Sequence, residues 1–223
     1  MTRITEEIHR IQKEIPTSVR LVAVSKFHPI EALQEAYDAG QRIFGESKVQ
    51  EMTMKHEALP KDIEWHFIGH LQTNKIKYMA PYVALIHGVD SYKLLAEINK
   101  QASKVGRIIP CLLQIHIAQE ETKFGFSKDE CLAMLEEGLW HTFNNVRIAG
   151  VMGMATNTDD EEQIASEFKS LSDFFHEVKD TYFKDTPEFC EISMGMSDDY
   201  PLAIRNGSTL IRVGSRIFGE RVY

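Results

Sequence analysis

The sequence predicts an α/β protein, a single (β/α)8 TIM barrel with an additional N-terminal helix. Apolar runs of strand length alternate with helical patterns, eight such runs are present, and 223 residues fit the size of one barrel. An open, doubly wound sheet uses the same units and is the alternative. Closure is favoured because eight strands are the number that a closed barrel requires.

The elements follow one another in a regular order. Ile4, Ile8, Ile11 and Ile15 recur at helical spacing and predict the additional helix, which ends before Pro16. The strands are expected at residues 19–25, 42–46, 64–68, 83–87, 111–116, 147–152, 189–192 and 209–213. The helices between them are expected at residues 29–39, 49–59, 72–79, 94–105, 132–139, 164–178 and 197–206. No linker or short repeat interrupts this order, so residues 1–223 are expected to form one domain.

Local signals support individual elements. The first strand contains four consecutive apolar residues at 21–24, which is typical of a parallel strand buried on both faces. Gly40 closes the helix at 29–39 as a carboxyl cap. Pro110 stands at the entry of the fifth strand, where proline is tolerated. Each element is therefore marked by its own residues as well as by its place in the order.

Composition and charge narrow the class of protein. Apolar residues make up 43% and charged residues 26%, which is ordinary for a globular protein. The net charge of -8 without a basic block argues against nucleic acid and anionic membranes as partners. No signal segment or membrane span is found, and Cys111, Cys131 and Cys190 are expected to be packed thiols in a reducing compartment. We expect a cytoplasmic monomer.

Lys26 is the leading candidate for chemistry. It directly follows the first strand and precedes a helix, and α/β proteins place their chemistry at such junctions. A lysine amine that has lost its proton condenses with carbonyl compounds to give Schiff bases. The alternative is an ordinary solvated strand end.

Two segments predict an anion site. Residues 193–197 and 212–216 follow the seventh and eighth strands, where barrels commonly bind phosphate. Glycine at 195 and 214 allows backbone to approach an anion, and serine at 197 and 215 supplies hydroxyl groups. The alternative for Ser197 is to cap the short helix at 197–206. Together with Lys26, the two segments favour a phosphorylated carbonyl compound as ligand.

Other side chains are given structural roles. His66 and His70 are four residues apart but fall on a strand and a loop, so a zinc site is not expected. Four methionines are expected to fill irregular space beside the bound ligand, namely Met152, Met154, Met194 and Met196. A sugar-phosphate aldolase would also use a barrel lysine, but the acid and base carboxylates that it needs are not identified.

Six segments carry a family resemblance. They are AVSK at 23–26, AYDAGQRIFGE at 36–46, WHFIGHLQTNK at 65–75, GVMGM at 150–154, SMGMS at 193–197 and GSTLIRVG at 207–214. Together they resemble the pyridoxal-phosphate homeostasis protein family, whose fold is the barrel domain of alanine racemase. The resemblance runs from the first strand to the carboxyl end of the chain.

The resemblance implies the cofactor and its contacts. Pyridoxal 5'-phosphate (PLP) would be held on Lys26 as an internal aldimine. Its phosphate would be held by Ser197, Gly214 and Ser215, and Arg212 would face the pyridine nitrogen. The ring site is expected to include Ser47 and Met194.

The sequence departs from the family pattern at two places. The family usually has asparagine at the position of Ser47 and an aromatic residue at the position of Lys48. Residues 27–28 are Phe-His, in place of a polar pair. Contacts to the ring hydroxyl group are therefore expected to differ from those of the family.

The resemblance also implies a function. The protein would bind PLP without turning over a substrate, and would buffer it or deliver it to apo PLP-dependent enzymes. The alternative is a racemase-like PLP enzyme, but racemisation needs a second base, which alanine racemase takes from another domain. A charged Arg212 beside the pyridine nitrogen also weakens the ring as an electron sink. Racemases share that arginine, so it disfavours an enzyme without excluding one. Lys123, in the loop after the fifth strand, is a candidate relay amine for release of the cofactor, with a solvated loop lysine as the alternative.

Overall fold

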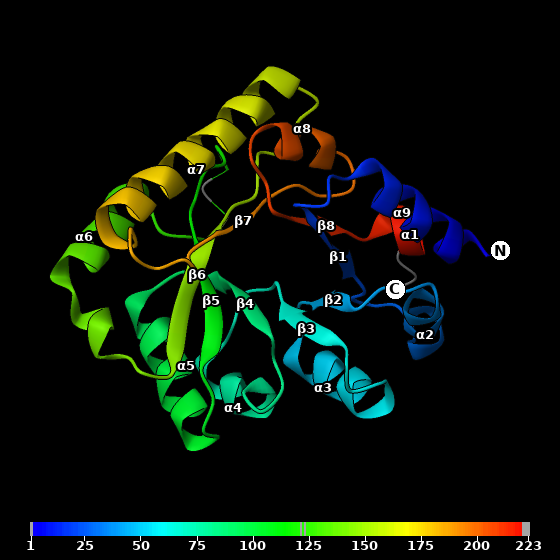
Figure 1. Ribbon diagram of the computed structural model, residues 1–223, viewed down its shortest axis with the longest axis horizontal. Coiled ribbons are helices and arrows are strands. Elements are labelled where there is room, and N and C mark those ends of the chain that lie inside the picture. Colours follow the sequence, from blue (N-terminus) through cyan, green and yellow to red (C-terminus); the bar gives the residue numbers. More distant parts are fainter. Residues whose placement is uncertain (1, 121, 123, 220–223) are drawn as a thin grey trace.

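The protein folds as a closed barrel of parallel strands surrounded by helices (Figure 1). The computed structural model describes residues 2–120, 122 and 124–219. The strands follow one another around the ring in chain order, and β1 pairs with both β2 and β8. The predicted barrel is therefore confirmed, and the open sheet is excluded.

All eight predicted strands are present. Their bounds are β1 Arg20–Val24, β2 Ile43–Glu46, β3 Glu64–Phe67, β4 Leu85–Val89, β5 Ile109–Gln114, β6 Val146–Met152, β7 Glu191–Ser193 and β8 Leu210–Val213. The limits differ from the expected ones by a few residues, because hydrogen bonding to the neighbouring strands decides where a strand ends.

The helices form the outer layer. The α-helices are α1 Arg3–Glu14, α2 Ile30–Asp38, α3 Val49–Ala58, α4 Ile76–Met79, α5 Tyr92–Lys104, α6 Lys128–Glu137, α7 Glu161–Tyr182, α8 Tyr200–Arg205 and α9 Ser215–Phe218. Two 3-10 helices are also present, η1 Thr73–Lys75 and η2 Leu139–Thr142. The additional helix α1 packs beside α2 and α9 (Figure 1).

Two expectations about helices need correction. The segment expected as one helix at 72–79 is divided into η1 and α4. Helix α8 begins at Tyr200 rather than at Ser197, with Asp199 as its N-cap residue and Pro201 in its first turn. Ser197 therefore does not cap α8.

The barrel has two apolar clusters. The larger one contains residues of the strands and of the helices that cover them. The smaller one lies inside the barrel and consists of Val22, Leu85, Leu112, Ala149, Met152 and Leu210. The barrel also buries polar side chains, namely those of His66, His87, Ser193 and Arg212.

The cysteines only partly fulfil the expectation. Cys111 and Cys131 are buried, but Cys190 is exposed, so the expectation was wrong for this residue. Cys190 directly precedes β7 at the amino end of the barrel, where no helix is required to cover it. Within the part of the chain that the structure describes, no helix has both the length and the apolar character needed to cross a membrane.

Candidate functional site

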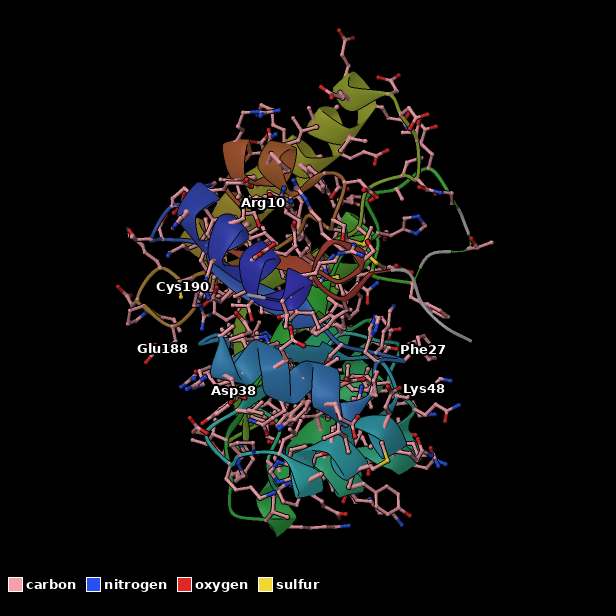
Figure 2. The ribbon with its side chains drawn as sticks, turned by 90° about the vertical axis from the view of Figure 1, so that its right-hand side faces the viewer. Arg10, Phe27, Asp38, Lys48, Glu188 and Cys190 are labelled. Atoms are coloured by element: carbon pink, nitrogen blue, oxygen red, sulfur yellow. The ribbon has the colours of Figure 1, made fainter. Side chains whose placement is uncertain are left out.

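The candidate site lies at the carboxyl ends of the strands. Figure 2 shows Phe27 and Lys48, which follow β1 and β2, on the side of the molecule opposite Glu188 and Cys190, which precede β7. In a parallel barrel all strands end on the same side. Lys26, a half-buried residue two positions after the end of β1, belongs to this side.

Three of the predicted phosphate residues are brought together. The Gly214 backbone N–H donates to Ser197 Oγ at 3.3 Å, and Ser215 Oγ donates to the same atom at 3.0 Å. Because Ser197 Oγ is the acceptor in both bonds, its own hydrogen can be donated to a further acceptor such as a phosphate oxygen. We call these three residues the hydroxyl cradle.

Two glycines near the hydroxyl cradle leave little room for a side chain. Gly195 has φ +93°, and a Cβ there would lie 2.6 Å from the Ala203 Cβ. A Cβ on Gly214 would lie 3.1 Å from the Val24 carbonyl oxygen. The end of β8 therefore packs tightly against the end of β1, which places the hydroxyl cradle beside the strand that leads to Lys26.

The acidic residues next to Ser197 do not prevent anion binding. Asp199 Oδ1 accepts a hydrogen bond from the Met196 backbone N–H at 2.5 Å. Asp198 is exposed to solvent. One carboxylate is thus committed to the loop and the other is solvated, where water screens its charge.

Arg212 supplies a positive charge inside the barrel. It is 4% exposed, and its guanidinium donates to Ser193 Oγ at 2.6 Å and to the Gly153 carbonyl oxygen at 3.1 Å. Burial lowers the pKa of Arg212 to about 10, and Asp199 acts in the opposite direction. The guanidinium is therefore charged at neutral pH and is held by two acceptors.

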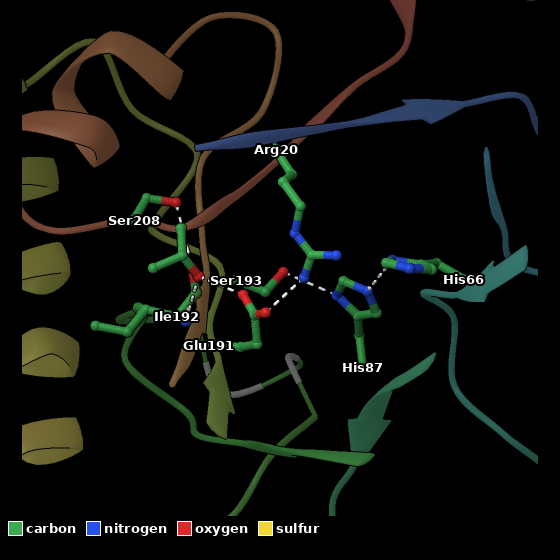
Figure 3. A network of polar contacts seen from close by, with 8 residues as sticks. Arg20, His66, His87, Glu191, Ile192, Ser193 and Ser208 are labelled. Atoms are coloured by element: carbon green, nitrogen blue, oxygen red, sulfur yellow. Dashed lines mark hydrogen bonds and ion pairs between the residues drawn. The ribbon is translucent and has the colours of Figure 1, made fainter. Parts of the chain in front are cut away.

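Two buried histidines continue this network (Figure 3). His87 Nδ1 lies 2.8 Å from Ser193 Oγ, and His87 Nε2 lies 3.0 Å from His66 Nδ1. Burial lowers the pKa of His66 to about 3 and that of His87 well below its ordinary value. We call Ser193, His87 and His66 the histidine column.

Arg212 is compatible with one tautomer of His87 in the histidine column. Arg212 donates to Ser193 Oγ, which leaves the Ser193 hydroxyl hydrogen available for Nδ1 of a neutral His87. In that tautomer of His87 the proton lies on Nε2, which lies 3.0 Å from His66 Nδ1. Toward the amino end of the barrel, Arg20 pairs with Glu191 at 2.5 Å (Figure 3).

Other predicted residues are less closely tied to this site. Met194 is fully buried, its backbone N–H donates to Leu210, and its carbonyl accepts from Ser208. Ser47 is half-buried and lies against Gly69, where a Cβ would be 2.6 Å from the Ser47 carbonyl oxygen. Contact of either residue with a cofactor stays a prediction. Lys123 lies outside the described residues.

The two departures from the family pattern contact each other. Lys48 Nζ lies 4.8 Å from the centroid of the Phe27 ring, at cation–π distance. Phe27 and Lys48 appear together on one side of Figure 2. The aromatic ring and the cation of this pair come from the two loops that follow β1 and β2.

Sequence reasoning missed a group of charged residues behind Lys26. Lys55 of α3 is 1% exposed and contacts Glu46 and Glu51. The spacing of Glu51 and Lys55, four residues apart on a predicted helix, was an available signal for one of these ion pairs. Nothing in the spacing of Glu46 and Lys55 indicates the other.

The histidines do not form a metal site. His66 bonds to His87, whereas His70 pairs with Asp90 and stacks on Phe124. Across the described residues, no group of three or more His, Cys, Asp or Glu side chains is arranged to hold a metal ion.

Comparison with known proteins defines the family. Residues 1–222 match the family described as alanine racemase, N-terminal domain. A pyridoxal phosphate homeostasis protein from Aquifex aeolicus is 36% identical over 228 residues, which cover 99% of this chain and 98% of the relative. The chain belongs to the pyridoxal phosphate homeostasis protein family. The resemblance found in the sequence is confirmed.

Solved structures agree with this assignment. PipY of Synechococcus elongatus PCC7942, solved without PLP, is 35% identical and matches with a TM-score of 0.91 over 97% of this chain and 100% of PipY. PipY with PLP bound matches with a TM-score of 0.87 at the same identity and coverage. Alanine racemase from Bartonella henselae, at 16% identity and a TM-score of 0.73, covers 98% of this chain and 59% of its own, and shares the fold.

Proposed function

We propose that the protein binds PLP at the carboxyl end of its barrel and buffers or delivers it without turning over a substrate. The observation that carries this proposal is the placement of the hydroxyl cradle against the end of β1, the strand that leads to Lys26. The PLP-bound structure of PipY, which is similar along its whole length, supports it.

The residues present fit the chemical groups of PLP. When bound, PLP supplies an aldehyde that condenses reversibly with a primary amine. Lys26 provides the amine, and Ser197 provides a hydroxyl hydrogen for the phosphate, with Gly214 and Ser215 beside it in the hydroxyl cradle. Arg212 holds a fixed positive charge for the side of the pyridine nitrogen, and Ser47 and Met194 complete the predicted ring site.

The fixed charge of Arg212 also favours a carrier over an enzyme. A guanidinium bonded to Ser193 and Gly153 cannot turn away from the ring without losing both acceptors. A cation in that place disfavours protonation of the pyridine nitrogen, which catalysis on amino acids exploits. A racemase-like enzyme is the alternative, and rapid exchange of an amino-acid α-proton in deuterated water would favour it.

The wider biological role is proposed along the same lines. We expect one domain over residues 1–223, a monomer, and a place in the cytoplasm. The recipients would be apo PLP-dependent enzymes. Mixing the PLP-loaded protein with an apo-enzyme and following recovery of that enzyme's activity would test delivery.

Attachment of PLP to Lys26 is the most direct test of the proposal. Borohydride reduction fixes the cofactor on the lysine that carries it, and peptide mass spectrometry identifies that lysine. We expect the adduct on Lys26 in the native protein and none at that peptide in Lys26→Ala, which should still fold because the residue is only half-buried. Adducts found only on other lysines would contradict the assignment.

A further inference from the structure

A buried ionic cluster lies between α3 and the barrel, directly behind the segment that carries Lys26. Lys55 Nζ donates at 2.7 Å to each of three acceptors: the Ser25 carbonyl oxygen, Glu46 Oε1 and Glu51 Oε1. The side chains of Lys55 and Glu46 are 1% and 0% exposed, and that of Glu51 is 17% exposed. We call Ser25, Glu46, Glu51 and Lys55 the Lys55 cluster.

The Lys55 cluster holds the peptide groups on both sides of Lys26. The Ser25 carbonyl, which belongs to the peptide before Lys26, accepts from Lys55 Nζ. The Phe27 N–H, which belongs to the peptide after Lys26, donates to Glu51 Oε1 at 2.6 Å. The backbone on either side of the Lys26 Cα is thus fixed by charged partners, and hydrogen bonds to charged groups are the strong ones.

The same segment has an unusual backbone conformation. Phe27 has φ +68°, and it is the only non-glycine residue with positive φ in the described part of the chain. The His28 N–H donates to the Ser25 carbonyl oxygen, which closes a turn with Lys26 and Phe27 at its centre. Side chains with a Cβ rarely adopt this conformation, and such residues persist only where the surroundings enforce them.

The chemistry of the Lys55 cluster suits this task. An ammonium group has three donors, and all three are used here. Ser25 Oγ donates to Glu46 Oε1 at 2.6 Å, so the strand end is held by its side chain as well as by its carbonyl. An apolar residue at 55 could fill the same volume but could not bond the Ser25 carbonyl.

We propose that Lys55 and Glu51 are positioning residues that hold the turn at 25–28 so that the Lys26 amine faces the ligand at the mouth of the barrel. The inference rests on the proposed function of Lys26. Lys55 and Glu51 act through the backbone of that residue and make no contact with the ligand. Their effect falls on the bond to the aldehyde and not on the recognition of the phosphate.

Comparing the binding of PLP and pyridoxine 5'-phosphate distinguishes a positioning role from a general loss of structure. PLP carries the aldehyde that reacts with an amine, whereas pyridoxine 5'-phosphate carries an alcohol in its place and keeps the ring and the phosphate. The ratio of their dissociation constants measures the part of the affinity that depends on the aldehyde. A variant that only loosens the fold changes both constants and leaves their ratio unchanged.

Glu51 offers the matched pair of variants. Glu51→Ala removes the acceptor of the Phe27 N–H, whereas Glu51→Gln keeps an oxygen acceptor and rescues the bond. Glu57→Ala, an exposed change on the same helix, is the control. Because Glu51 is partly exposed, its variants are better suited to this test than Lys55→Met, which leaves carboxylates buried without their cation.

We expect Glu51→Ala to weaken PLP about tenfold while pyridoxine 5'-phosphate changes less than about twofold. Glu51→Gln should recover most of the lost ratio, and Glu57→Ala should match the native protein. An unchanged ratio in Glu51→Ala would overturn the proposal. If native protein and Lys26→Ala gave the same ratio, the proposed function of Lys26 itself would fail, and the positioning role with it.

Discussion

The Lys55 cluster and the histidine column bury polar groups on opposite sides of the barrel wall. The first lies between α3 and the strands and is ionic, with Lys55 bonded to two carboxylates. The second lies inside the barrel and contains neutral imidazoles, because burial lowers the pKa of both His66 and His87. The ion pairs of Lys55 are thus buried outside the barrel strands, whereas inside the barrel the imidazoles are neutral and the charge of Arg212 is held by the neutral acceptors Ser193 Oγ and the Gly153 carbonyl.

The difference separates two ways of orienting a functional group. Lys55 and Glu51 hold the backbone on both sides of Lys26 through hydrogen bonds to charged groups. The histidine column holds one side chain, Arg212, through a series of single hydrogen bonds. Removing a charged residue of the Lys55 cluster should therefore lower the stability of the fold. The histidine column should instead lose stability when its histidines are protonated.

The largest effect is expected when the Lys55 cluster loses its cation. Lys55→Met leaves Glu46 and Glu51 without their partner, and breaking a buried ion pair in this way costs about 3 to 5 kcal/mol of unfolding free energy. Burial already raises the pKa of Glu46, with Lys55 acting against it, so the variant should favour protonated Glu46. Urea unfolding at pH 7 measures the loss. The same substitution at exposed Lys100 is the control. Similar losses of stability at both positions would contradict the expected role of the buried cation.

Acid should weaken the histidine column. The pKa of His66 is about 3 in the folded protein, against 6.5 for an ordinary histidine. Between these values the unfolded chain binds a proton that the folded protein excludes, so stability is complete above about pH 6.5 and is lost as the pH falls toward about 3. The slope is about 1.4 kcal/mol per pH unit for each histidine, and His87 adds to it in the same direction.

Unfolding by urea between pH 7 and pH 5 checks this slope. Arg212, which bonds to Ser193, has a pKa of about 10, so it keeps its charge over this pH range and does not contribute to the slope. His87→Gln should give a shallower dependence on pH than the native protein. His176→Gln, at an exposed position of α7, should leave the native slope intact, and equal slopes for all three proteins would refute the neutral column.

A smaller effect is expected from the hydroxyl cradle. Ser197→Ala removes one hydrogen bond to a charged phosphate, which costs roughly 1.5 to 3 kcal/mol, or about ten- to a hundredfold in affinity. Unphosphorylated pyridoxal should bind as before, since it makes no use of this contact. Ser103→Ala on exposed α5 surface serves as the control. Equal losses for both ligands would place the phosphate elsewhere.

The smallest effect is expected at the pair formed by exposed Lys48 and half-buried Phe27. A cation–π contact at an exposed site contributes about 0.5 to 1 kcal/mol, so Lys48→Ala should lower stability by no more than that. Lys77 lies 4.9 Å from the ring of Tyr78 and offers a matched control on α4. A loss several times larger for Lys48→Ala than for Lys77→Ala, by urea unfolding, would show that this cation belongs to a buried network.

The candidate site was predicted where its residues follow strands in a regular order. Lys26 and the segments at 193–197 and 212–216 could be placed at one end of a barrel because parallel strands all end on the same side. The start of α8 was predicted three residues too early, although Pro201 in its first turn was an available signal in the sequence. Ser197 consequently lies before the helix, where its hydroxyl meets Gly214 and Ser215.

The sequence by itself determined the alternation of strands and helices, their number, and the position of Lys26 at the end of the first strand. The spacing of apolar residues shows whether a segment is a strand or a helix, and the order of these segments predicts the features named here. Only the tertiary structure decided that Lys55 meets Glu46 and the Ser25 carbonyl, and that His87 meets Ser193 across 106 positions of the chain. Such contacts depend on the register and closure of the barrel, which bring together side chains that no local pattern relates.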